Sequence, residues 1–147
     1  MNGIMHRGPN RFLVVAATLS AIAGLVHLGC IVFGAPWYRF FGAGEGMARL
    51  AEAGHWYPSV FALAIASVLF SWSLYALSGA GIIRRLPLLK LGLCVITAIY
   101  LVRGIGFAAI MPLFPGNSPV FWLVSSGICL AIGLVHLLGV RQAWVRL

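Results

Sequence analysis

Acidic residues are almost absent from this 147-residue sequence. It contains only Glu45 and Glu52, against ten lysines and arginines, and charged residues make up 8% of the chain. Soluble domains carry about 25% charged residues. A hydrophobic fraction of 62% and a mean hydropathy of +1.03 instead indicate a chain surrounded by lipid. We therefore predict one integral membrane domain over residues 1–147, without a separate soluble module.

Motifs that carry chemistry are also scarce. The three cysteines, Cys30, Cys94 and Cys129, each lie within an apolar run and show neither a CxxC motif nor Cys/His spacing for a metal. The excess of basic residues does not indicate a nucleic-acid partner, because these residues lie at the ends of apolar runs and form no solvated basic face. No cofactor is predicted, and the lack of a nucleophile or paired-acid motif argues against an enzyme.

Apolar segments long enough to cross a bilayer, about 20 helical residues each, recur along the chain. The turn residues of MPLFPGNSP, residues 111–119, divide the last apolar run into two. Ser118 before Pro119 is typical of a helix start, and Pro58 fits the first turn of another helix. We predict an all-α fold, a four-helix transmembrane bundle with spans at about 12–33, 58–79, 88–111 and 119–140.

The basic residues predict the orientation of these spans. One side of the membrane receives Arg7, Arg11, Arg84, Arg85, Lys90, Arg141 and Arg146, whereas on the other side Arg39 and Arg49 are offset by the two glutamates. The positive-inside rule then places both termini in the cytoplasm. The segment around Ala21–Ala23 imitates a signal-peptide cleavage site, but the apolar run continues well beyond it, so we expect the first helix to be retained.

The exterior segment 45–53 has the pattern of a short amphipathic helix between the first two spans. Glu45, Arg49 and Glu52 are spaced i, i+4, i+7, and Met47 and Leu50 fall on the opposite side. Such a helix is expected to lie with its apolar side in the headgroup boundary or on the ends of the spanning helices. The spacing also predicts two helical ion pairs, Glu45 with Arg49 and Arg49 with Glu52.

The same segment has a possible metal-binding pattern. Glu45, Glu52 and His55 form an E-x6-E-x2-H sequence, which resembles half of a carboxylate-bridged dimetal site. The second half is missing, since no other carboxylate side chain exists in the chain. Glu52 and His55 are therefore only candidate ligands for a single divalent ion. Because the pattern is incomplete, no metal site is predicted.

Two polar residues inside predicted spans are candidates for a functional role, His27 and the charged Arg103. Charges at membrane depth usually face a functional interior, and both residues are expected near the outer end. Together with neighbouring polar groups they define a candidate outward-facing pocket formed by His27, Glu45, Glu52, His55, Tyr100 and Arg103. The structural alternatives are that Arg103 extends to the headgroups and that His27 binds a neighbouring helix.

Small residues recur at helical spacing on two predicted spans. The stripes consist of Ser20, Ala23, Gly24 and His27 on the first, and Ser125, Cys129, Gly133 and His136 on the fourth. Small side chains let membrane helices approach closely. We interpret both stripes as packing surfaces, and the repeated GLVHL that contains His27 and His136 as a coincidence of packing sequence.

The motifs GAPWYRFFG and SLYALSGAGIIRRLPLLKL, in this order around an exterior loop, resemble those of small bacterial four-helix inner-membrane proteins, loosely DoxX-like. The resemblance implies a bacterial inner-membrane location and transfers no catalytic residue. We expect a non-enzymatic module that self-associates or binds a membrane-protein partner or lipid. The alternatives are a small transporter or channel subunit using the candidate pocket, and a metal- or quinone-dependent enzyme.

Overall fold

The computed structural model describes residues 8–113 and 116–147, and this part of the chain is helical without any strand. Arg7, one of the basic residues used to predict the orientation, lies outside the described residues. The predicted all-helical class is confirmed. The helices are α1 (Arg11–Phe33), α2 (Ala35–Phe40), α3 (Glu45–Glu52), α4 (Trp56–Ala80), α5 (Leu89–Ile105), α6 (Phe107–Ile110), the 3-10 helix η1 (Met111–Leu113) and α7 (Pro119–Ala143).

Three of these helices, α1, α4 and α7, are long and apolar enough to cross a membrane. A fourth span exists only if α5 and the α6–η1 unit are counted together across a bend of 72°. The continuous helix predicted over 88–111 is therefore wrong. Gly106 lies at the break, where an added Cβ would lie 2.8 Å from the carbonyl oxygen of Val102. Glycine weakens helices, and sharp bends commonly occur at such residues.

Helix starts follow the sequence closely. The side chain of Ser118 accepts a hydrogen bond from the Phe121 amide at 3.1 Å, so the predicted N-cap of α7 is confirmed. Pro58 lies in the first turn of α4, as predicted. Asn10 caps α1 by accepting from Leu13 and also donates to the Gly139 carbonyl at 3.1 Å. This second bond ties the start of α1 to the last turns of α7.

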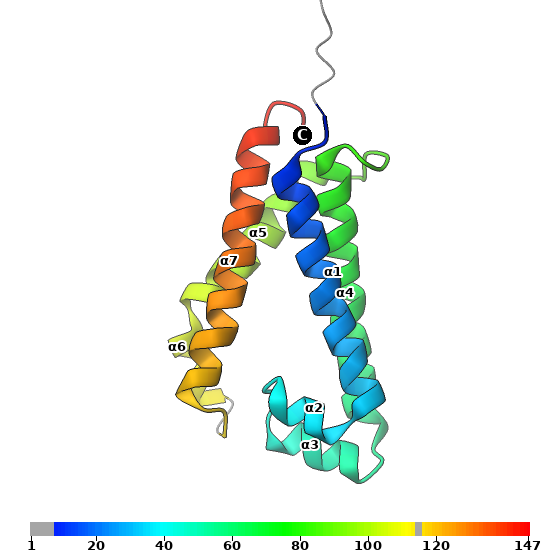
Figure 1. The fold of residues 1–147 in the computed structure, drawn as a ribbon, viewed down its shortest axis with the longest axis vertical. Coiled ribbons are helices and arrows are strands. Elements are labelled where there is room, and N and C mark those ends of the chain that lie inside the picture. Colours follow the sequence, from blue (N-terminus) through cyan, green and yellow to red (C-terminus); the bar gives the residue numbers. More distant parts are fainter. Residues whose placement is uncertain (1–7, 114–115) are drawn as a thin grey trace, which may run out of the picture.

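The long helices form two antiparallel pairs, α1 beside α4 and α5 beside α7 (Figure 1). Small residues allow the close approach within each pair, as the stripes predicted: Gly24 lies against the Phe70 ring and Gly133 against Leu101. Gly104 brings two backbones together, since an added Cβ there would lie 2.8 Å from the backbone of Leu130. The two pairs converge at the end that holds the C-terminus and separate toward α2 and α3 (Figure 1).

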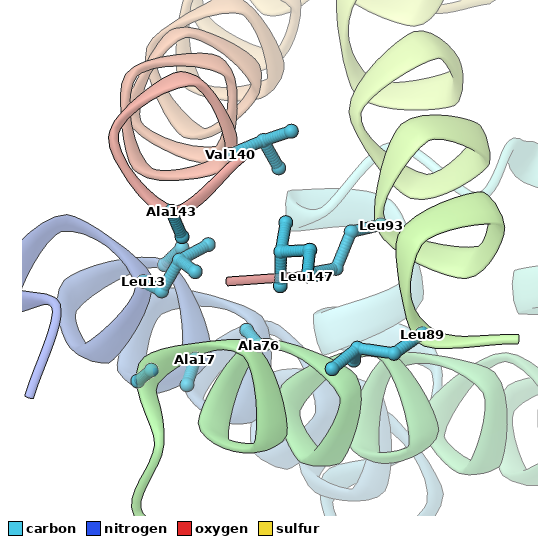
Figure 2. Close-up of a cluster of buried hydrophobic side chains, with 10 residues drawn as sticks. Leu13, Ala17, Ala76, Leu89, Leu93, Val140, Ala143 and Leu147 are labelled. Atoms are coloured by element: carbon cyan, nitrogen blue, oxygen red, sulfur yellow. The ribbon is translucent and has the colours of Figure 1, made fainter. Parts of the chain in front are cut away.

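We call the first of these ends the converging end, defined by residues 10–17, 76–93 and 139–147. Its core gathers small and branched apolar side chains from all four long helices (Figure 2). Leu13 is fully buried there, and an added Cβ on Gly139 would lie 2.7 Å from its Cγ. Close backbone approach around one large side chain therefore joins the two helix pairs.

The opposite, splayed end consists of α2, α3 and the start of α7, residues 35–54 and 116–122. The pairs are linked there by a contact that we call the clasp, formed by Gly42, Asn117 and Phe121. Asn117 Nδ2 donates to the Gly42 carbonyl at 2.8 Å, and the Phe121 ring lies where a Cβ on Gly42 would stand. Gly42 has a φ of +72°, so the backbone turn and the ring contact both favour glycine.

Candidate functional site

The two carboxylates come together on Arg39, a residue of α2. Arg39 Nε and Nη2 donate to the two oxygens of Glu45, each at 2.9 Å, and Nη1 donates to Glu52 Oε1 at 2.7 Å. The predicted Glu45–Arg49 pair also exists, at 3.3 Å. Glu52, however, pairs with Arg39 and not with Arg49 as predicted. The forked guanidinium of Arg39 offers a bidentate geometry to Glu45 and a further donor to Glu52.

This network sets the protonation of the carboxylates. Hydrogen bonds from Arg39, and then from Arg49, lower the pKa of Glu45 to about 2, and the bond from Arg39 lowers the pKa of Glu52. The same bonds raise the pKa of Arg39. A carboxyl group with a lowered pKa is ionised at neutral pH and is a poor general acid. The geometry therefore favours joining α3 to α2 over acid–base chemistry.

His55 lies just beyond α3, exposed, as the N-cap residue of α4. No hydrogen bond connects it to Glu52 within the described residues. Residues 8–113 and 116–147 also contain no group of three or more His, Cys, Asp or Glu side chains that could hold a metal ion. The Glu52 carboxylate instead accepts a hydrogen bond from Arg39.

Arg103 lies on α5, close to the helix break, and extends across to α7. Its Nη1 donates to Ser126 Oγ at 3.1 Å and its Nη2 to Ser125 Oγ at 3.3 Å. The guanidinium carbon is 5.1 Å from the centre of the Trp122 ring, a cation–π distance. The side chain is half-buried, and its polar contacts hold the two helices of one pair together.

The remaining pocket candidates have different partners. His27 Nδ1 is 2.8 Å from the Ala23 carbonyl of its own helix, so the expected bond to a neighbouring helix is replaced by a local one. Tyr100 Oη is 3.0 Å from Ser20 Oγ. Among the described residues, no hydrogen bond or ion pair links His27, Arg103 and the glutamates. The six predicted residues thus fall into separate sets, with Glu45 and Glu52 brought together.

A buried polar centre, which the sequence analysis did not single out, lies between the helix pairs. It consists of Ser20 of α1, Trp72 of α4, Tyr100 of α5 and His136 of α7. The Tyr100 ring centre is 5.1 Å from that of Trp72 and 5.3 Å from that of His136. His136 is fully buried, and its Nε2 has no hydrogen-bond partner in the described residues. The packing stripes contain Ser20 and His136, but spacing on separate helices does not show that Tyr100 lies between them.

The converging end carries most of the basic side chains. Two of them bind backbone oxygens of the C-terminal segment: Arg85 donates to Arg146 and Leu147, and Lys90 Nζ donates to Trp144 at 3.3 Å while lying 3.8 Å from its ring centre. Four further side chains have no hydrogen bond or ion pair with the part of the chain that the structure describes. These are the arginines Arg11, Arg84, Arg141 and Arg146, all exposed.

The charged side chains of these sites differ in whether they have partners. The carboxylates and Arg103 are bound by other side chains, whereas the four arginines of the converging end have no such partner within residues 8–113 and 116–147. No protein-family model, no curated protein and no solved structure matches the chain.

Proposed function

We propose that the chain is a small polytopic inner-membrane protein of bacterial type, built as a four-helix transmembrane bundle in which α5, α6 and η1 together form the third span. The converging end and both termini face the cytoplasm, and α3 lies at the outer headgroup boundary. Large apolar side chains exposed along the long helices support a lipid environment; they include Ile22, Leu63, Val95 and Leu134, each about half exposed. The positive-inside rule supports the orientation.

Within that membrane, we propose a non-enzymatic role as a module that binds lipid, a second copy or a membrane-protein partner. One observation carries this proposal: four exposed arginines at the converging end lack a partner in the described chain, while both carboxylates are held by Arg39 at the splayed end. A membrane surface with anionic lipid attracts such basic groups. The free charge is therefore available for binding.

Purification into nanodiscs tests this role. We expect the protein to retain anionic lipid, to self-associate or to hold a partner, as measured by native mass spectrometry and light scattering. A monomer that retains none of these would contradict it. The orientation is tested separately with Gly46→Cys and Arg84→Cys variants: an impermeant maleimide added to intact cells should label the first and leave the second unlabelled.

A small transporter or channel subunit is the second candidate, and the broken helix favours it. Transporters often place their sites where a membrane helix is interrupted, and Arg103 lies close to the 72° bend. The test is flux into proteoliposomes across candidate ions and solutes. We expect Arg103→Ala and His27→Ala to reduce flux, and unchanged flux in both variants would exclude this candidate.

A further inference from the structure

Helix α5 has an apolar groove on each side. The α5/α7 groove encloses about 550 Å³ and is lined by residues that include Cys94, Ala98, Leu101, Leu137, Arg141 and Trp144. The α4/α5 groove encloses about 510 Å³ and is lined by residues that include Trp72, Tyr75, Leu91 and Val95. The two grooves are close in volume. They differ in charge, because only the α5/α7 groove is lined by a charged residue, Arg141.

Arg141 has no counter-charge among the residues that the structure describes. It is exposed in the last turn of α7 and forms no hydrogen bond or ion pair with the described residues. Both carboxylate side chains of the sequence are held by Arg39 at the splayed end. Next to the groove, Lys90 contacts the ring of Trp144 and donates to its carbonyl oxygen. An apolar slot therefore ends at a guanidinium without a partner among the described residues, beside an indole that Lys90 contacts.

We propose that the α5/α7 groove binds one acyl chain of an anionic phospholipid, with the lipid phosphate on Arg141. This inference rests on the membrane placement proposed above and names the ligand class of that module. The aliphatic stem of Arg141 packs along the apolar lining while its guanidinium reaches the headgroup level. Guanidinium binds phosphate through paired hydrogen bonds. The α4/α5 groove, lined by no charged residue, accepts acyl chains without selecting a headgroup.

Charge disfavours a second copy of the chain as the occupant. The formal net charge is +8, and the described part of the converging end contains no acidic residue to face Arg141 of another copy. A twofold contact between identical surfaces repeats the same residues on both sides. It would therefore bring two basic surfaces together without an acidic residue on either side, which is unfavourable, whereas a phosphate supplies the missing negative charge.

Native mass spectrometry of the full chain, released from nanodiscs of phosphatidylcholine and phosphatidylglycerol, tests the proposal. The readout is the ratio of bound phosphatidylglycerol to bound phosphatidylcholine. Removing one interfacial arginine that binds lipid, in Arg141→Gln, should lower this ratio roughly fivefold. Arg84→Gln removes the same charge from the same end, at a residue that does not line the groove, and should leave the ratio nearly unchanged.

Two groove-filling variants on α5 provide the second arm. Ala98→Phe fills the α5/α7 groove and Val95→Phe fills the α4/α5 groove; both residues are exposed, so the fold should tolerate either change. We expect Ala98→Phe to abolish the preference for phosphatidylglycerol and Val95→Phe to preserve it. Equal effects of Arg141→Gln and Arg84→Gln would show diffuse attraction and overturn the proposal, as would an Ala98→Phe variant that keeps the preference.

Two further outcomes separate this inference from the proposed function. Dimers that Ala98→Phe dissociates would show that a second copy occupies the groove, which overturns the lipid site and supports a self-associating module. A chain that enters the bilayer without preferring either lipid would also overturn the site alone. A chain that fails to insert into the bilayer would overturn both.

Discussion

The two ends of the molecule differ in how the helix pairs are joined and in which charged side chains have partners. At the converging end, all four long helices pack around Leu13, but Arg141 and three other arginines have no partner among the residues that the structure describes. At the splayed end the helix pairs separate, yet Arg39 hydrogen-bonds both carboxylates and the clasp at Gly42 links the pairs. Both ends have an apolar cluster, and that of the splayed end joins Ala35 and Tyr38 of α2 to Ala48 of α3 and Ala62 of α4. The converging end thus joins the pairs by packing, whereas the splayed end pairs its charges and links the pairs through the clasp.

The largest expected effect comes from breaking the converging end. Leu13→Ala should lower the free energy of unfolding by about 2 kcal/mol, in the lower part of the range for such truncations. In lipid the substitution loses packing contacts but no free energy of transfer from water, so the loss is smaller than in a soluble core. Denaturant titration in mixed micelles measures the change. Leu25→Ala, on the same helix but 59% exposed, is the matched control and should change little. Equal losses would contradict a core centred on Leu13.

Next in size is the contact of Arg103 with α7. Arg103→Gln and Ser126→Ala should each destabilise the protein, and the double variant should reveal a coupling energy of about 1 kcal/mol, because the two side chains share a charged hydrogen bond. A double-mutant cycle of unfolding free energies measures it. Ser67→Ala, whose hydroxyl bonds only its own helix, is the control partner and should not couple. Additive effects for Arg103 and Ser126 would show that the bond contributes nothing.

A smaller, local effect is expected at the clasp. Gly42→Ala should displace the Phe121 ring and increase the separation of the helix pairs at the splayed end, with little change in overall stability. Spin labels at Phe40→Cys and Val120→Cys, in a chain without its native cysteines, report this distance. Gly44→Ala is the control, since Gly44 also has a positive φ, +92°, but has open space around it. Equal distance changes in both variants would assign the effect to backbone strain and not to the ring contact.

The smallest effect concerns protonation at the splayed end. Arg39→Gln should raise the pKa of Glu45 from about 2 toward its ordinary value of 4.5, because its main hydrogen-bond donor is lost. Infrared titration with labelled glutamate measures this pKa. Because the pKa of Glu45 is lowered in the folded state, its ionised carboxylate stabilises the contact of α2 with α3 at pH values above the unfolded-state pKa. This stabilisation is lost as the pH falls from about 4.5 to about 2.

Arg49→Gln provides the comparison for that titration. It removes the weaker donor to Glu45 and should raise the pKa less than Arg39→Gln does. If the Arg49 variant showed the larger rise, Arg49 would be the principal partner of Glu45. The pair predicted from helical spacing would then dominate over the contact between α2 and α3.

Local patterns predicted the helices well. Turn residues and Ser118 located the start of α7, and the spacing of Glu45 and Arg49 predicted both α3 and their ion pair. The break in α5 was not predicted, although Gly104 and Gly106 lie beside it, because glycine also occurs in continuous helices where neighbours approach closely. Arg39 was missed as the partner of Glu52 because the two residues belong to different helices.

The sequence by itself determined that the chain is helical, apolar enough to cross a membrane and basic at one set of loops, because these properties depend on composition and on contacts a few residues apart. The tertiary structure decided which polar groups meet. It brought Tyr100 next to His136, let Arg103 donate hydrogen bonds to two serines of α7 and left Arg141 beside an open groove. Such pairings depend on how whole helices cross, and many different crossings are compatible with the same periodic pattern.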